Sequence, residues 1–169
     1  MHPHPDGSLA AQRVAVLVDT GSVYHAARQL HRGKLDYRRL LAHVVGGRQL
    51  VRAVAYVVRA EGVDMSAFLG ALEAQGFELR VKTTRREPEG PVRADSRVSL
   101  ALDAVAIAPH VDAVALVSGD GDLAELAGPV SAAGARLEVH AFEGSIAERL
   151  ACAAHVCCPF GEELLLGSE

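Results

Sequence analysis

The hydrophobic positions of this chain follow two periods that alternate along its length. Short continuous apolar runs, typical of strands buried on both faces of a sheet, occupy residues 13–18, 50–59, 77–82, 113–117, 136–142 and 155–158. Between these runs, residues at helical spacing occupy positions 21–30, 37–45, 65–75, 98–108, 123–133 and 145–151. Asp36 is a candidate N-cap for the second of these helices, and Gly46 is a candidate stop.

Strands that alternate with helices over short links predict an α/β fold, a three-layer sandwich around a mostly parallel central sheet. Residues 83–93 carry two prolines and no apolar period, so we expect an exposed loop there. The pattern divides the chain into a short disordered lead at 1–12, one domain at 13–159 and a C-terminal tail at 160–169.

Composition narrows the classes of protein that this pattern can represent. Half of the 169 residues are hydrophobic and only 4% are aromatic, which predicts an aliphatic core. The formal net charge of −4 excludes a protein that is basic overall, so any contact with nucleic acid must be local. There is no apolar run long enough for a membrane span and no secretory signal pattern, so we expect a cytoplasmic protein. The sequence leaves open whether the protein forms a homo-oligomer.

The cysteines gather near the C-terminus, where Cys152, His155, Cys157 and Cys158 superficially resemble a soft-metal cluster. Tetrahedral zinc sites normally use separated pairs of ligands, whereas neighbouring residues of a strand point to opposite faces. Small thiols are also common in protein cores, and we therefore favour ordinary core residues over a zinc site.

Two of the buried runs end in acidic residues. The run at 13–18 leads into Asp19, and the run at 113–117 leads through Ser118 into Asp120 and Asp122. In open α/β sheets, functional groups collect beyond the carboxyl ends of the strands. Carboxylates at this edge predict a metal site for Mg²⁺ or Mn²⁺ at Asp19, Asp120 and Asp122.

Each of these residues also has a structural interpretation. Asp19 could form an Asx-turn, and Asp122 could cap the helix that follows it. Asp103 interrupts an apolar helix, where an unpaired carboxylate would be costly, so we expect it to face the cleft or to be paired. Ser118 more often satisfies the backbone of a turn than acts as a nucleophile.

Positive charge concentrates just before the helix at 98–108. The five basic side chains concerned are Lys82, Arg85, Arg86, Arg93 and Arg97. They could form cationic walls that bind an RNA backbone, or they could simply be the solvated side chains of a surface loop. Neither common glycine-rich nucleotide motif occurs, so we expect no nucleotide cofactor.

With these elements placed, three blocks of the chain resemble the NYN domain, in the LabA-like branch of the PIN-like nucleases. The blocks are Val-Leu-Val-Asp-Thr-Gly-Ser at 16–22, Leu-Ala-Leu-Asp at 100–103, and Val-Ser-Gly-Asp-Gly-Asp at 117–122. The resemblance implies a PIN-like sheet with an acidic cleft, and divalent ions that hydrolyse RNA. Asp19, Asp103, Asp120 and Asp122 match the acidic positions of the family, which implies a catalytic role for them, with Ser22 and Ser118 as supporting residues.

The chain departs from the family pattern at two places. Ser22 stands where the family usually has Asn, and Ser96 and Arg97 stand where it usually has a Val-Asp pair. Asp95 could replace the missing acid if the loop shifts. The leading hypothesis is a metal-dependent ribonuclease. The first alternative is a catalytically impaired NYN domain that acts as an RNA-binding or regulatory module. The third hypothesis is a phosphatase-like or receiver-like protein.

Overall fold

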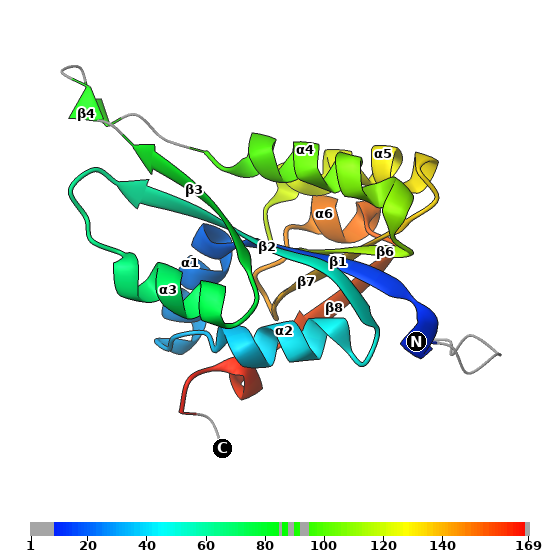
Figure 1. Ribbon diagram of the computed structural model, residues 1–169, viewed down its shortest axis with the longest axis horizontal. Helices are drawn as coiled ribbons and strands as arrows, with labels where there is room; N and C mark the ends of the chain where they lie inside the picture. Colours follow the sequence, from blue (N-terminus) through cyan, green and yellow to red (C-terminus); the bar gives the residue numbers. More distant parts are fainter. Residues whose placement is uncertain (1–8, 85, 88–89, 92–94, 168–169) are drawn as a thin grey trace.

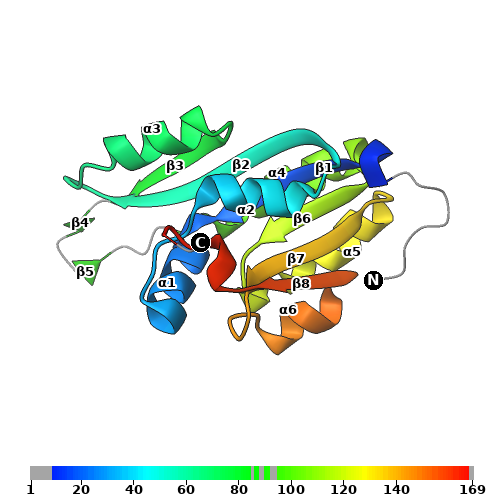
Figure 2. The same cartoon turned by 90° about the horizontal axis from the view of Figure 1, so that it is seen from below.

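A parallel sheet forms the centre of the molecule. The computed structural model describes residues 9–84, 86–87, 90–91 and 95–167. Within these residues the main sheet has six strands, all paired in parallel and lying side by side from β3 to β8 (Figure 2). Their spatial order is β3 (Glu78–Thr84), β2 (Gln49–Ala60), β1 (Arg13–Asp19), β6 (Ala113–Val117), β7 (Arg136–Phe142) and β8 (Val156–Phe160).

Helices cover both faces of this sheet (Figure 1). One face carries α1 (Thr20–His31), α2 (Tyr37–Val45) and α3 (Ser66–Ala74). The other carries α4 (Arg97–Ile107), α5 (Ala127–Ala132) and α6 (Glu148–Ala153). The predicted three-layer α/β sandwich is therefore confirmed. No helix among the described residues combines the length and apolarity needed to cross a membrane.

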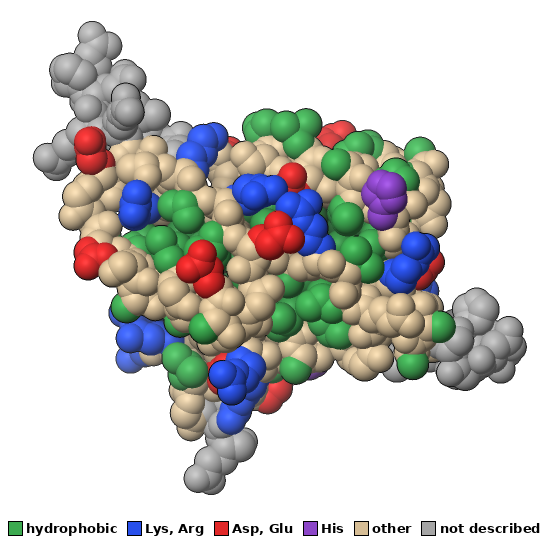
Figure 3. All heavy atoms as spheres, viewed as in Figure 1, with side chains coloured by type: hydrophobic (Ala, Val, Ile, Leu, Met, Phe, Trp, Pro, Cys, Tyr) green, Lys and Arg blue, Asp and Glu red, His purple; other side chains and the backbone are tan. Residues whose placement is uncertain are grey.

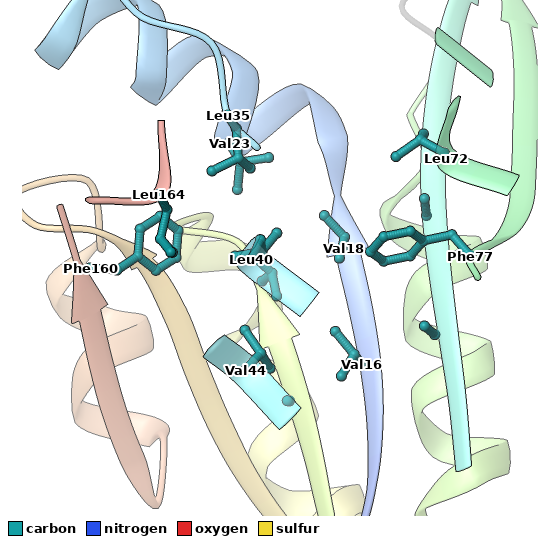
Figure 4. Packing of buried hydrophobic residues seen from close by; sticks show 14 of the residues in the cluster. Val16, Val18, Val23, Leu35, Leu40, Val44, Leu72, Phe77, Phe160 and Leu164 are labelled. Atoms are coloured by element: carbon teal, nitrogen blue, oxygen red, sulfur yellow. The ribbon is translucent and has the colours of Figure 1, made fainter. Parts of the chain in front are cut away.

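The continuous apolar runs fill two cores because successive side chains of a strand point to opposite faces. Val16 and Val18 of β1 belong to the core under α1, α2 and α3, whereas Leu17 belongs to the core under the other three helices. Figure 4 shows Leu40 and Val44 of α2 close to these two valines. Asp36 caps α2 by accepting hydrogen bonds from the amides of Arg38 and Arg39, as predicted.

The packed part of the chain extends past Pro159. Phe160, Leu164 and Leu165 all join the core that α1, α2 and α3 cover, and Leu165 forms an isolated antiparallel bridge with Leu35. At the other end, Leu9–Ala11 form a short 3-10 helix, and the rest of the predicted lead before them lies outside the described residues.

The prediction of an α-helix at 123–133 was wrong for the first half of this range. The chain forms a 3-10 helix at Gly121–Leu126, and α5 begins only at Ala127. Pro129 explains the difference, since it lacks the amide that would donate to residue 125 in a continuous α-helix. A proline is tolerated in the first turn of α5, where the amides need no helical partner.

Three further expectations need correction. Part of the predicted loop at 83–93 is strand, because β3 continues to Thr84 and two residues each of β4 (Arg86–Glu87) and β5 (Gly90–Pro91) pair as a hairpin. The predicted helix at 145–151 begins three residues later, at Glu148. The thiols of Cys152 and Cys157 are exposed rather than in the core, because α6 and the edge strand β8 leave them at the surface.

Candidate functional site

Two neighbouring strands bring Asp19 and Ser118 together at the carboxyl edge of the sheet. β1 pairs directly with β6, so the residues that follow their last pairs lie side by side. The Ser118 hydroxyl donates to Asp19 Oδ2 at 3.2 Å and accepts from the amide of Asp120 at 3.2 Å. Ser118 therefore links Asp19 to Asp120, as expected of a serine in a polar turn.

Ser22 ties the beginning of α1 to the same turn. Its amide donates to Asp19 Oδ1 at 3.3 Å, and its hydroxyl accepts from the amide of Gly119 at 3.2 Å. Asp19 is thus the N-cap of α1, while its other oxygen faces β6. The serine that replaces the usual family residue still connects the two strand ends.

Gly119 permits a close approach that sequence analysis did not single out. A Cβ at this position would lie 2.0 Å from the carbonyl oxygen of Ser145, so only glycine fits there. The carbonyl of Gly119 accepts from the amide of Ala147 at 3.0 Å. This contact draws the loop before α6 to the site and helps to explain why that helix begins late.

Arg97 lies among the acids at the start of α4. Its Nε donates to Asp95 Oδ2 at 2.7 Å, and its Nη1 donates to Asp120 Oδ2 at 3.2 Å and to Asp122 Oδ2 at 2.5 Å. The hydrogen bond from Arg97 is the main cause that holds the pKa of the Asp95 carboxyl below its ordinary value. The guanidinium joins three carboxylates into one cluster.

Asp120, rather than Asp122, caps the 3-10 helix. The Asp120 side chain accepts from the amide of Asp122 at 3.0 Å. The side chain of Asp122 is two-thirds exposed, and Arg149 also approaches it at 3.9 Å. The residue that caps this helix is therefore Asp120, two positions before Asp122, the residue that the sequence suggested as a cap.

Asp103 does not join the cluster. It accepts from the hydroxyl of Tyr56 at 2.7 Å and from Arg80 Nε at 3.3 Å. Six residues along an α-helix span about 9 Å, so Asp103 lies well beyond Arg97 and over β2 and β3. The expectation that this carboxylate is paired is confirmed, but the structure does not place it with Asp19 and Asp120.

Burial is the main cause that raises the pKa of Asp19 above its ordinary value. The negative charges of Asp120 and Asp95 raise it further, while the hydrogen bonds from Ser22 and Ser118 lower it. The Asp19 side chain is almost fully buried, so water does not screen these effects well.

The basic run is only partly within the described residues. Lys82 Nζ donates to the backbone carbonyl of Asp95 at 2.9 Å and so lies near Arg97. Arg85 and Arg93 lie outside the described residues, and of Arg86 only the backbone is described, in β4. On the face seen in Figure 3, the described Lys and Arg side chains lie among Asp and Glu rather than in one basic field.

The sequence predicts Mg²⁺ or Mn²⁺ at the carboxylates of this cluster. Carboxylate oxygens suit such hard cations. However, within the described part of the chain no three Asp, Glu, His or Cys side chains converge as ligands. The positive charge between Asp120 and Asp122 is instead the guanidinium of Arg97. The three-acid metal site predicted at Asp19, Asp120 and Asp122 does not fit this arrangement.

A cavity of about 820 Å³ opens beside the cluster. Its polar end includes Asp19, Arg97 and Asp120. Its other end is largely apolar and is lined from three helices and β2 by Tyr24, Tyr37, Val57, Val58, Met65 and Phe68. Sequence analysis did not find this apolar end, because its residues are far apart along the chain.

The parallel sheet, its order and the acidic strand ends define a PIN-like α/β domain. A family model for the NYN domain matches residues 13–159, and the chain belongs to this family. NYN domains belong to the PIN-like nuclease superfamily. The LabA-like branch remains a prediction.

The chain is similar over nearly its whole length to a protein of known structure. A crystal structure of VPA0982, a protein of unknown function from Vibrio parahaemolyticus, matches with 28% sequence identity and a TM-score of 0.84. The match covers 93% of this chain and 98% of the Vibrio protein. No curated protein matches the sequence significantly.

Proposed function

We propose that this chain is an RNA-binding NYN domain in which the Arg97 guanidinium takes the place of a divalent cation, so that metal-dependent cleavage of RNA is largely lost. The observation that supports this proposal is the set of contacts from Arg97 to Asp95, Asp120 and Asp122. The family supplies RNA as the expected partner.

The charge of Arg97 opposes metal binding directly. A guanidinium stays protonated throughout the physiological pH range, so it competes with Mg²⁺ or Mn²⁺ for Asp120 and Asp122 at every relevant pH. A metal ion would have to displace a side chain that three carboxylates hold. A carboxylate at this position would add a ligand, whereas the arginine removes one and repels the ion.

The same guanidinium can bind RNA. Its nitrogens already donate to Asp95, Asp120 and Asp122, so a phosphate would exchange with one of these carboxylates as hydrogen-bond partner. The Arg97 side chain is 39% exposed, so a phosphate can reach its charge from solvent. Lys82 adds a second cation close by.

A metal-dependent ribonuclease is the second candidate. It is favoured by the retention of Asp19 and Asp120 at adjacent strand ends, joined through Ser118. This candidate requires Arg97 to leave the acids when a metal ion binds. Cleavage that depends on Asp120 would distinguish it from the RNA-binding proposal.

The test compares RNA binding with RNA cleavage in the same samples. The affinity for a fluorescein-labelled single-stranded RNA is measured by anisotropy, once with EDTA and once with Mn²⁺, and RNA integrity is followed on a gel. We expect wild type to bind equally in both solutions and to leave the RNA intact. Mn²⁺-dependent cleavage by wild type that Asp120→Asn abolishes would favour the ribonuclease.

Arg97→Asp restores the acid of the family pattern. We expect this variant to gain a thermal shift with Mn²⁺ of about 5 °C at a metal concentration about 100 times Kd, because a ligand replaces a repelling charge. The control is Arg13→Asp, the same charge change at the opposite end of β1. Equal Mn²⁺ shifts in wild type, Arg97→Asp and Arg13→Asp would contradict the role given to Arg97.

A further inference from the structure

We infer that the apolar end of the cavity is a stacking subsite for one unpaired nucleobase of a single-stranded RNA whose phosphate lies at Arg97. This inference rests on the proposed function and adds a substrate feature to it. The residues that would contact the base are Tyr24, Tyr37 and Phe68, with Val58 and Met65 beside them.

The few aromatic side chains of the chain are concentrated here. The sequence has three tyrosines, four phenylalanines and no tryptophan, and Tyr24, Tyr37 and Phe68 all line this one cavity. They come from α1, α2 and α3, three separate helices. The rings of Tyr37 and Phe68 meet edge to face with centroids 5.6 Å apart, which holds a rigid aromatic wall.

Tyr24 offers a ring that is free to accept a ligand. Tyr24 is 53% exposed. Among the described residues, no other tyrosine or phenylalanine is exposed. Its one described ring contact is edge-on with the neighbouring His25, at a centroid distance of 5.6 Å. A second cavity of about 310 Å³ is lined by the same three residues, so the aromatic wall borders two cavities.

The aromatic wall is continuous with the polar end of the cavity. Tyr37 lines the cavity together with Asp19 and Arg97, and the charge of Asp19 raises the pKa of the Tyr37 hydroxyl in addition to the larger effect of burial. The Tyr37 hydroxyl has no hydrogen-bond partner within the described residues. One site thus offers a donor for phosphate, an unpaired hydroxyl and a stacking surface.

This combination fits a nucleotide better than an apolar peptide. An apolar peptide has no group that requires the Arg97 guanidinium in the lining of its groove. A base offers a π-face that stacks on any aromatic ring, which predicts tolerance of sequence and a requirement for unpaired bases. Bases within a duplex are already stacked on one another and could not enter.

The test uses two probes of equal length, a single-stranded oligouridylate and an abasic oligomer with the same sugar-phosphate backbone. Binding is measured by anisotropy with wild type, Tyr24→Ala, Tyr24→Phe and Phe68→Leu. The control is Leu30→Ala, which removes a similarly exposed side chain from α1 outside both cavities. The measurements are made in EDTA, so that cleavage does not interfere.

We expect wild type to bind the intact RNA about tenfold more tightly than the abasic oligomer, in line with the stacking of one base. Tyr24→Ala and Phe68→Leu should lose most of this difference, whereas Tyr24→Phe and Leu30→Ala should keep it. Equal affinity of wild type for the two probes, or equal effects of Tyr24→Ala and Leu30→Ala, would overturn the subsite and leave the backbone-binding function intact. Failure of wild type to bind either probe would instead overturn the proposed function, and the subsite with it.

Discussion

At the scale of single residues, the site combines features that suit function and oppose stability. Asp19 is almost fully buried, and its pKa is raised because its charged form is poorly solvated and lies near other acids. Perturbed carboxyls in clefts are typical of functional sites. Arg97 offsets part of this charge, because its guanidinium contacts the neighbouring acids.

Asp19→Asn should raise the melting temperature at pH 7 by about 2 °C or more. The neutral amide keeps an acceptor for Ser22 and removes the unfavourable buried charge. Because the folded-state pKa of Asp19 lies above its unfolded value, wild type gains stability as the pH falls through that raised pKa. The advantage of the variant should therefore shrink on acidification.

Thermal melts from pH 7 to pH 4 check this prediction. Asp112→Asn is a control of opposite sign, since the hydrogen bonds from Arg13 lower the pKa of Asp112. That variant should be less stable than wild type at pH 7, and the gap should close on acidification. Parallel profiles for the two variants would contradict the assignment.

At the scale of elements, the sequence predicted best those strands that are buried on both faces. The bounds of β6 and β7 agree with the prediction, because a central parallel strand needs a continuous apolar run. Pro129 and the turn at Gly119 shifted the boundaries of α5 and α6, because local backbone demands outweighed apolar spacing.

Gly119→Ala tests the close approach between the β6 turn and the loop before α6. The new Cβ would collide with the Ser145 carbonyl, so the backbone must move. We expect a loss of about 1–3 kcal/mol in the free energy of unfolding, measured by urea denaturation. Gly128→Ala in α5 meets open space and should instead stabilise by about 0.4–1 kcal/mol. Similar effects of the two substitutions would argue against this explanation.

At the scale of the whole molecule, the candidate site could be predicted only in part. The acids at adjacent strand ends follow from the order of strands and from the rule that parallel strands end at one edge. The contact of Arg97 with Asp95 depends on the loop before α4, and the aromatic wall depends on the packing of three helices. The aromatic wall is not encoded in spacing along the chain, because its residues are far apart in the sequence.

A buried ion pair lies away from that edge, near the start of β7. Glu138 is 5% exposed, and its carboxylate accepts from Arg48 at 2.9 Å and from Arg136 at 3.2 Å. Burial alone would raise its pKa, but His140 and Arg48 together hold it at about 2. The pKa of Glu138 is thus lowered, whereas the pKa of Asp19 is raised.

Glu138→Gln should therefore destabilise the protein strongly at pH 7, by about 3–5 kcal/mol, because Arg48 would remain buried without its counter-charge. The folded-state pKa lies below the ordinary value of 4.5, so the stabilisation is fully present above pH 4.5 and is lost as the pH falls toward 2. Urea denaturation at several pH values should show the gap between wild type and variant narrowing below pH 4.5. A gap that stays constant down to pH 2.5 would mean that packing, not the charge of Glu138, stabilises this end of the sheet.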